Sequence, residues 1–205
     1  QTLTNKTLTA PKINENVAVT STATELNLLD GVPNATYLAI PGKTEGTNFA
    51  NSLLVGHATT GTLSSAENNT AVGINALNSI TSGDKNTVMG FDAGTNITGA
   101  TQNTIIGSDA FKGSATDANS GYNTVVGAYA MNVASGAAYN TAIGRDAGRG
   151  VTTGDRNILI GYDGGDNITS GTGNVVIGTV DADSATGDRQ LKIAGNDGST
   201  TTTWI

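Results

Sequence analysis

A short motif recurs at a nearly fixed interval over most of this 205-residue chain, and it constrains the fold more than any other feature. Each copy is a brief apolar run that ends in glycine, as in "NTAIG" at residues 140–144. Every step between copies is 17 residues long, except for one step of 20. The repeated glycines are Gly56, Gly73, Gly90, Gly107, Gly127, Gly144, Gly161, Gly178 and Gly195.

A unit of 17 residues predicts one coil of a β-solenoid. It is too short for a strand–helix–strand crossover, and its apolar runs are rich in Val and Ile. A second apolar column stands eleven residues after the first residue of the motif and predicts a second short strand; it comprises Ile80, Ile97, Val151 and Ile168. Turns such as "SGDKN" and "TGDRN" would form the corners. We therefore expect an all-β rod of about nine coils.

Two neighbouring apolar residues in each run cannot both be buried within one chain. Successive side chains on a strand point to opposite faces, so Ala142 and Ile143 must diverge. One column fills the interior and the other forms an outward apolar stripe, which water penalises at about 25 cal/mol per Å². Another copy of the same chain carries the same stripe, and the two stripes can bury each other. The pattern therefore predicts a homo-oligomer.

The sequence does not decide which of the two columns faces inward. The candidates for the subunit contact or the core are Val72, Met89, Ile106, Val126, Ile143, Ile160 and Ile177. The alternative set consists of the residues that precede them, among them Ala142, Leu159 and Val176.

Seven central copies begin with asparagine, and this column has two interpretations. An internal ladder of side-chain amides would join coil to coil, as in stacked sheets. An exposed polar row could instead bind glycans. The ladder is favoured because a receptor site would not need every coil. Its members are Asn69, Asn86, Asn103, Asn123, Asn140, Asn157 and Asn174.

Tandem copies of the pattern N-[ST]-x-[AVI]-[IV]-G-x-x-A, as at residues 140–147, resemble the head repeats of trimeric autotransporter adhesins and related repeats of bacteriophage tail fibres. The resemblance covers roughly residues 52–182 and implies a homotrimer. "TNKTLTAPKI" (4–13) and "TATELNLLDGV" (22–32) are similar to stem segments of phage tail-fibre proteins, which favours that family. Thr22 and Glu25 fit a capping box, so we expect a short helix near 23–30, supported by three copies around one axis.

These observations predict three segments. They are an N-terminal stem and trimerisation segment (1–50), a solenoid shaft or head (51–180) and an exit segment (181–205) that leads into a further C-terminal part. The resemblance implies a virion tail fibre that gives reach and attaches to a host surface glycan or protein, beside other tail proteins. The alternative is the head of a bacterial trimeric adhesin on the cell surface. A polysaccharide-cleaving tailspike is the third interpretation.

Composition and motifs argue against other classes. The net charge is −7 and the ten Lys and Arg residues are scattered, so we expect no nucleic-acid partner. No apolar run approaches the ~18 residues that span a bilayer, so we expect no membrane insertion. The chain has no cysteine and one histidine, and His57 is expected on the surface or at a coil end. A metal ring on the threefold axis, with one histidine from each chain, is the other interpretation. We see no catalytic or cofactor motif and expect neither an enzyme nor a bound cofactor.

An acidic column stands two residues after the repeated glycine. It contains Asp92, Asp109, Asp146 and Asp163. Stacked carboxylates repel one another unless a hydrogen-bond donor or a hard cation such as calcium lies between them. A structural role, in which each Asp closes a turn with a backbone amide, is the favoured interpretation, and a metal column is the other.

Two further surface features remain. The 20-residue step adds three residues within 111–122 and predicts a protruding loop, where Lys112, Asp117 and Asn119 are candidate contact residues. The threonines that follow the asparagines could form an ice-binding rank, but this column changes to Ile158 and Val175 and has no second threonine column beside it.

Overall fold

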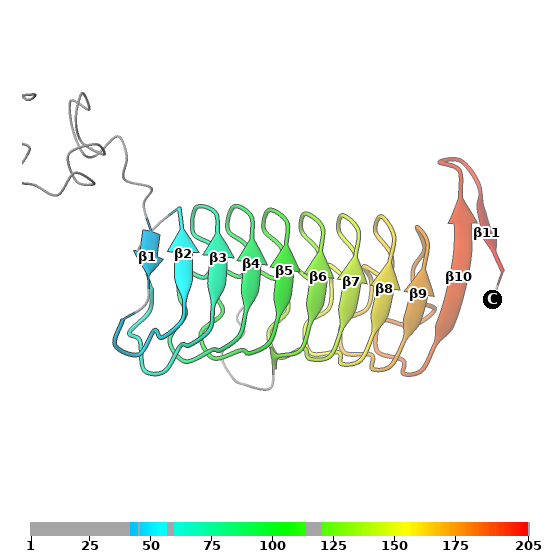
Figure 1. Ribbon diagram of the computed structural model, residues 1–205. Coiled ribbons are helices and arrows are strands. Elements are labelled where there is room, and N and C mark those ends of the chain that lie inside the picture. The colour runs from blue at the N-terminus through cyan, green and yellow to red at the C-terminus, as the bar shows by residue number, and fades with distance from the viewer. Residues whose placement is uncertain (1–41, 45, 57–59, 114–119, 205) are drawn as a thin grey trace, which may run out of the picture. The chain divides into compact units, whose positions relative to one another are not determined.

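The computed structural model describes residues 42–44, 46–56, 60–113 and 120–204 (Figure 1). These residues form eleven strands, and no α-helix occurs among them. Residues 1–41 of the predicted stem, with the helix near 23–30, lie outside the described residues, as do His57, Asp117 and Asn119. The described end of the predicted stem belongs to the solenoid, because β1 (Gly42–Thr44) pairs with β2 (Leu53–Val55) and Phe49 is buried in the core.

The strands form one sheet whose order follows the sequence. They are β1 (Gly42–Thr44), β2 (Leu53–Val55), β3 (Thr70–Val72), β4 (Thr87–Met89), β5 (Thr104–Ile106), β6 (Thr124–Val126), β7 (Thr141–Ile143), β8 (Ile158–Ile160), β9 (Val175–Ile177), β10 (Leu191–Asn196) and β11 (Thr201–Thr203). Strands β2 to β10 are parallel, and equivalent residues pair in every step, as Ile143 with Ile160. The antiparallel strands β1 and β11 lie at the two ends (Figure 1).

The predicted β-solenoid of 17-residue coils is confirmed, with about eight turns rather than nine. Figure 1 shows the coils stacked side by side, each contributing one arrow to the same face. The ninth copy does not close a coil. Its glycine, Gly195, lies inside β10, which continues to Asn196 and pairs with β11. The degraded motif "LKIAG" therefore forms an end hairpin in place of a turn.

The prediction of two strands per coil was wrong for the described residues, where each coil has one. The second apolar column is buried as expected, with Ile80, Ile97, Val151 and Ile168 fully inside. These residues follow turns whose backbone contains positive φ values, such as +56° at Leu77. An extended strand cannot pass through such a residue, so this side of the coil consists of linked turns.

The interior is filled from both sides of each coil. The middle residue of each strand from β2 to β9 is buried, as at Leu54 in β2, Leu159 in β8 and Val176 in β9. These side chains meet the second apolar column in a single continuous core. Ala71 and Ala142 are also in this set, so the column mixes small and large residues.

The repeated glycine is required by the close passage of the next coil. Gly161 has φ +132°, and a Cβ placed there would lie 2.6 Å from the carbonyl oxygen of Gly178. Any other residue would combine a disfavoured backbone conformation with a clash against main chain that cannot move independently. This explains why every coil ends its apolar run in glycine.

Candidate functional surfaces

The outward face of the sheet carries an apolar stripe one residue wide. The third residue of each short strand from β3 to β9 points away from the core, and four of these side chains are 38–51% exposed. The others are half-buried. The stripe consists of Val72, Met89, Ile106, Val126, Ile143, Ile160 and Ile177. The structure thus places these residues outside, and the residues that precede them form the core.

Apolar residues that follow the repeated glycine widen the stripe over the N-terminal coils. Ile74 and Phe91 follow the repeated glycine in adjacent coils, and both are more than half exposed. The backbone N–H of Asp92 donates to the carbonyl of Ile74, which holds these two coils in register. Further along, the equivalent positions are Arg145 and Tyr162, with the guanidinium 5.5 Å from the ring centroid. Over β8 to β10 the outward apolar surface instead includes the first strand position, where Ile158 is 41% and Leu191 51% exposed.

The outward threonines lie beside this stripe at the first position of the strands. Thr70, Thr87 and Thr124 are exposed, and Thr104 and Thr141 are half-buried. Because the column runs one side chain wide and turns apolar at Ile158, it offers hydroxyls over only five coils.

All seven repeated asparagines are buried and bonded from coil to coil. The Oδ1 atom of each accepts the backbone N–H of its counterpart in the next coil, as Asn140 does from Asn157 at 2.8 Å. The Nδ2 of Asn140 donates to the carbonyl of Gly154, fourteen residues ahead, at 2.9 Å. Ser52 and Gln190 take the equivalent places at the two ends. An amide serves this position because it offers a donor and an acceptor at once.

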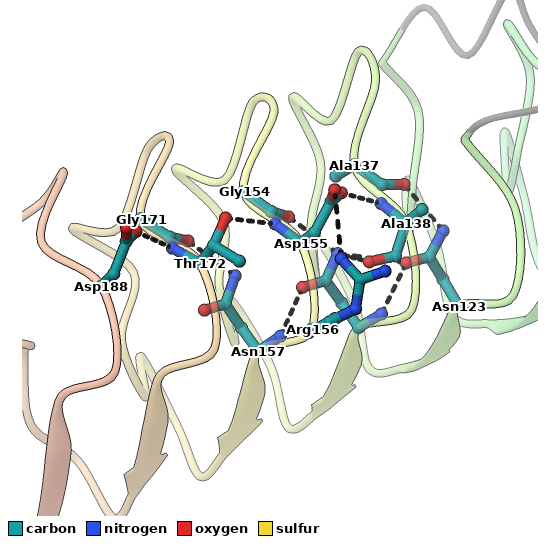
Figure 2. A network of polar contacts seen from close by, with 11 residues as sticks. Asn123, Ala137, Ala138, Gly154, Asp155, Arg156, Asn157, Gly171, Thr172 and Asp188 are labelled. Atoms are coloured by element: carbon teal, nitrogen blue, oxygen red, sulfur yellow. Dashed lines mark hydrogen bonds and ion pairs between the residues drawn. The ribbon is translucent and has the colours of Figure 1, made fainter.

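A second polar chain lies at the corner that precedes each strand (Figure 2). Asp155 Oδ1 accepts the N–H of Ala138 at 2.8 Å, and the N–H of Asp155 donates to the Thr172 hydroxyl at 3.3 Å. Asp188 Oδ1 in turn accepts the N–H of Thr172 at 2.8 Å. These contacts hold the corner backbone in place, and the side chain of Arg156 projects from this backbone (Figure 2).

In the predicted acidic column, side-chain cations pair with Asp92, Asp109 and Asp146. Lys112 Nζ is 2.7 Å from Asp92 Oδ2 and 2.7 Å from Asp109 Oδ1. The hydrogen bond from Lys112 lowers the pKa of Asp92, and the bonds to both aspartates raise the pKa of Lys112. Asp146 is approached by Arg145 at 3.2 Å and by Arg149 at 3.7 Å. Lys112, a candidate contact residue, is thus held by carboxylates.

The acidic column ends at a shallow pocket of about 250 Å³. Asp163, Asp166 and Asp181 line it together with Thr179 and Val180. Burial and the hydrogen bond with Asp181 raise the pKa of Asp166 to about 6. Across the described residues, no group of three or more acidic or histidine side chains has an arrangement that could hold a metal ion.

Sequence reasoning missed one surface, which we call the Tyr–Arg column: Tyr122, Tyr139 and Arg156. These residues immediately precede three successive asparagines of the ladder. The two tyrosine rings are parallel, with an interplanar angle of 3° and centroids 4.8 Å apart. The guanidinium carbon of Arg156 lies 4.9 Å from the Tyr139 centroid. Aligning the repeats on the asparagine would have revealed the column.

The chain matches no protein-family model, no curated protein and no solved structure. In the part of the chain described by the structure, no helix is long and apolar enough to cross a membrane.

Proposed function

We propose that this chain is a structural and adhesive segment of a viral tail fibre, assembled as a homotrimer through the apolar stripe. The observation that carries the proposal is the stripe itself. Val72, Met89 and Ile106 stand in line on adjacent strands and expose between 38 and 51% of their surface in the single chain. A contiguous apolar surface of this kind is typical of an interaction site.

A second copy of the chain suits this stripe because the two surfaces share the same repeat spacing. Strands pair in register over eight consecutive parallel steps, so one stripe can meet its equivalent at every coil. Cyclic symmetry would bring these equivalent positions together at the same height. The number of subunits, three, is inferred from the resemblance of the "NTAIG" repeats to those of tail fibres and adhesin heads.

In this proposal the solenoid supplies mechanical reach in the virion and the trimer attaches to a glycan or protein on the host surface. The bacterial adhesin head remains the alternative, since its assembly would rest on the same stripe. A membrane-anchor domain elsewhere in the full protein would identify the adhesin. The proposal includes no catalytic role.

Mass in solution tests the assembly. We expect sedimentation equilibrium to give three times the 20.5 kDa chain mass. Ile106→Glu places a charge in the middle of the stripe and should produce monomers, because a buried unpaired carboxylate is strongly unfavourable. Ser135→Glu, at an exposed position outside the strands, is the matched control and should remain a trimer. A wild-type monomer at working concentration would refute the proposal.

Attachment is tested separately on cells. Purified trimers carrying a fluorescent label should decorate susceptible host cells, and release of reducing sugars should stay at background. A trimer that decorates none of a broad set of hosts would show a purely structural shaft. Sugar release would show a tailspike instead.

A further inference from the structure

The Tyr–Arg column contains the one stacked pair of aromatic rings found among the described coils. The chain contains nine aromatic residues, and two of them stack here with 46% and 50% of their surface exposed. Because each residue stands on its own coil, the spacing between the side chains is fixed by the backbone. Tyr139 N–H donates to the carbonyl of Gly121, and Arg156 N–H donates to that of Ala138. The column is therefore organised before any partner arrives.

The corner before the strands carries charges of both signs, because Glu67, Asp84, Asp155 and Asp188 each stand one residue before a position that precedes the ladder. The chain has a net charge of −7, yet the residues that immediately precede the ladder include no acid. From the first coil to the last, these positions are Asn68, Lys85, Gln102, Tyr122, Tyr139, Arg156, Gly173 and Arg189. Among these positions, tyrosine and arginine stand on successive coils only at Tyr122, Tyr139 and Arg156.

The side chain of Arg156 is 63% exposed and only loosely paired. Its closest carboxylate oxygen, Asp155 Oδ2, is 3.9 Å away, which is too long for a hydrogen bond. The other oxygen of Asp155 accepts the backbone N–H of Ala138, so this carboxylate is held by the corner network (Figure 2). The guanidinium therefore retains donors for an external anion, and it prefers planar carboxylates that it can contact with two N–H groups.

We propose that the Tyr–Arg column binds an acidic polysaccharide whose sugar units carry carboxylates. The inference rests on the proposed attachment function and names the class of host ligand. Arg156 would pair with a sugar carboxylate, and the phenol groups of Tyr122 and Tyr139 would exchange hydrogen bonds with sugar hydroxyls.

A nucleic acid fits this surface less well. Nucleobases bind by stacking on a free aromatic face. One face of Tyr139 is covered by the Tyr122 ring and the guanidinium of Arg156 lies over the ring as well. Tyr139 therefore offers a ligand its ring edge and hydroxyl beside a guanidinium, which suits a ligand rich in hydroxyls and carboxylates.

The test is calorimetric titration of the full chain with oligogalacturonate. Arg156→Gln should weaken binding about fivefold to tenfold through loss of a charge-assisted hydrogen bond. Tyr139→Phe keeps the stacked ring and should weaken binding about threefold through loss of one neutral hydrogen bond. A neutral malto-oligosaccharide should give no measurable heat.

The chain supplies matched controls at the opposite end of the strands. Arg145 also lies over a tyrosine, Tyr162, and is similarly exposed. Arg145→Gln and Tyr162→Phe therefore make the same chemical changes away from the column, and binding should stay within about twofold of wild type. Circular dichroism of all four variants should match wild type, since each substitution is exposed and conservative.

Several results would overturn the inference. These are no binding of oligogalacturonate by the wild type, unchanged binding in both column variants, or an equal loss in Arg145→Gln. Binding of oligo(dT) as tight as that of the sugar would assign the column to nucleic acid instead. Trimeric wild type that decorates cells while Arg156→Gln decorates them equally would remove this inference and leave the proposed function standing. A monomeric wild type whose sugar binding still depends on Arg156 and Tyr139 would refute the proposed trimeric fibre and leave this inference standing.

Discussion

Removing one rung of the asparagine ladder should destabilise the solenoid severely, and Asn140→Ala is the substitution to make. Asn140 is 1% exposed and lies in the middle of the ladder. Its Oδ1 accepts the N–H of Asn157 at 2.8 Å, and its Nδ2 donates to the carbonyl of Gly154 at 2.9 Å. Alanine leaves both of these buried backbone groups without their ladder partner.

The expected loss in the free energy of unfolding follows from these two groups. A buried polar group left unsatisfied costs about 1–3 kcal/mol, so the two together predict about 2–6 kcal/mol. Asn140→Asp keeps the acceptor for Asn157 but replaces the donors with a buried anion facing the Gly154 carbonyl. We expect it to cost at least as much at neutral pH and to recover partly in acid, where the protonated carboxyl can donate.

Urea unfolding followed by far-ultraviolet circular dichroism measures both effects at one fixed protein concentration. Thr141→Ala, at the next position but pointing outward, is the control and should stay within about 0.5 kcal/mol of wild type. An Asn140→Ala midpoint equal to that of Thr141→Ala would refute the reasoning that the ladder stabilises the coils.

Three further predictions concern backbone and charge. Gly161→Ala should cost more than about 3 kcal/mol or prevent folding, because its Cβ would meet the next coil's carbonyl at 2.6 Å; soluble yield and the urea midpoint report it. Lys112→Met should cost about 1 kcal/mol, because two aspartates lose the ammonium held between them, and added salt should reduce the difference from wild type. Asp166 has a raised pKa of about 6, so the folded state holds its proton more tightly than the unfolded state and stability should fall as the pH rises from about 4 to about 6. This loss should be on the order of 1 kcal/mol after solvent screening, and the pH dependence of the urea midpoint should be flatter in Asp166→Asn.

Much of the architecture was predictable because the repeat is local information. The 17-residue spacing gave the coil, and the glycine in each copy marked the end of the strand. The absence of a second strand in each coil was harder to predict from the sequence. Ile80 and Ile97 look like strand residues by composition, but the preceding turns contain left-handed residues, including Leu77 at φ +56°, and leucine gives no sign of that conformation.

The orientation of the two apolar columns could have been deduced by combining two observations. A side-chain ladder that joins coils lies inside, so Asn140 is inward. The period of two then places Ala142 inward and Ile143 outward, as the structure has them. Taken separately, neither pattern decides the question.

The Tyr–Arg column was predictable only in part. The sequence places Tyr122, Tyr139 and Arg156 at equivalent positions. Their stacking depends on the exact stagger of adjacent coils and on the left-handed backbone at all three residues, which have φ of 64°, 61° and 57°. The directions of these three side chains are therefore set only once the coils have closed and stacked.

By itself the sequence determined the period of the solenoid, the glycine at each crossing and the alternation that leaves one apolar column outside. These properties follow from backbone geometry that acts within a few residues. Only the tertiary structure decided that Lys112 lies between Asp92 and Asp109, and that the second side of the coil is made of turns. Both depend on contacts between coils, where residues about twenty positions apart become neighbours, and such contacts exist only once the chain has closed its turns.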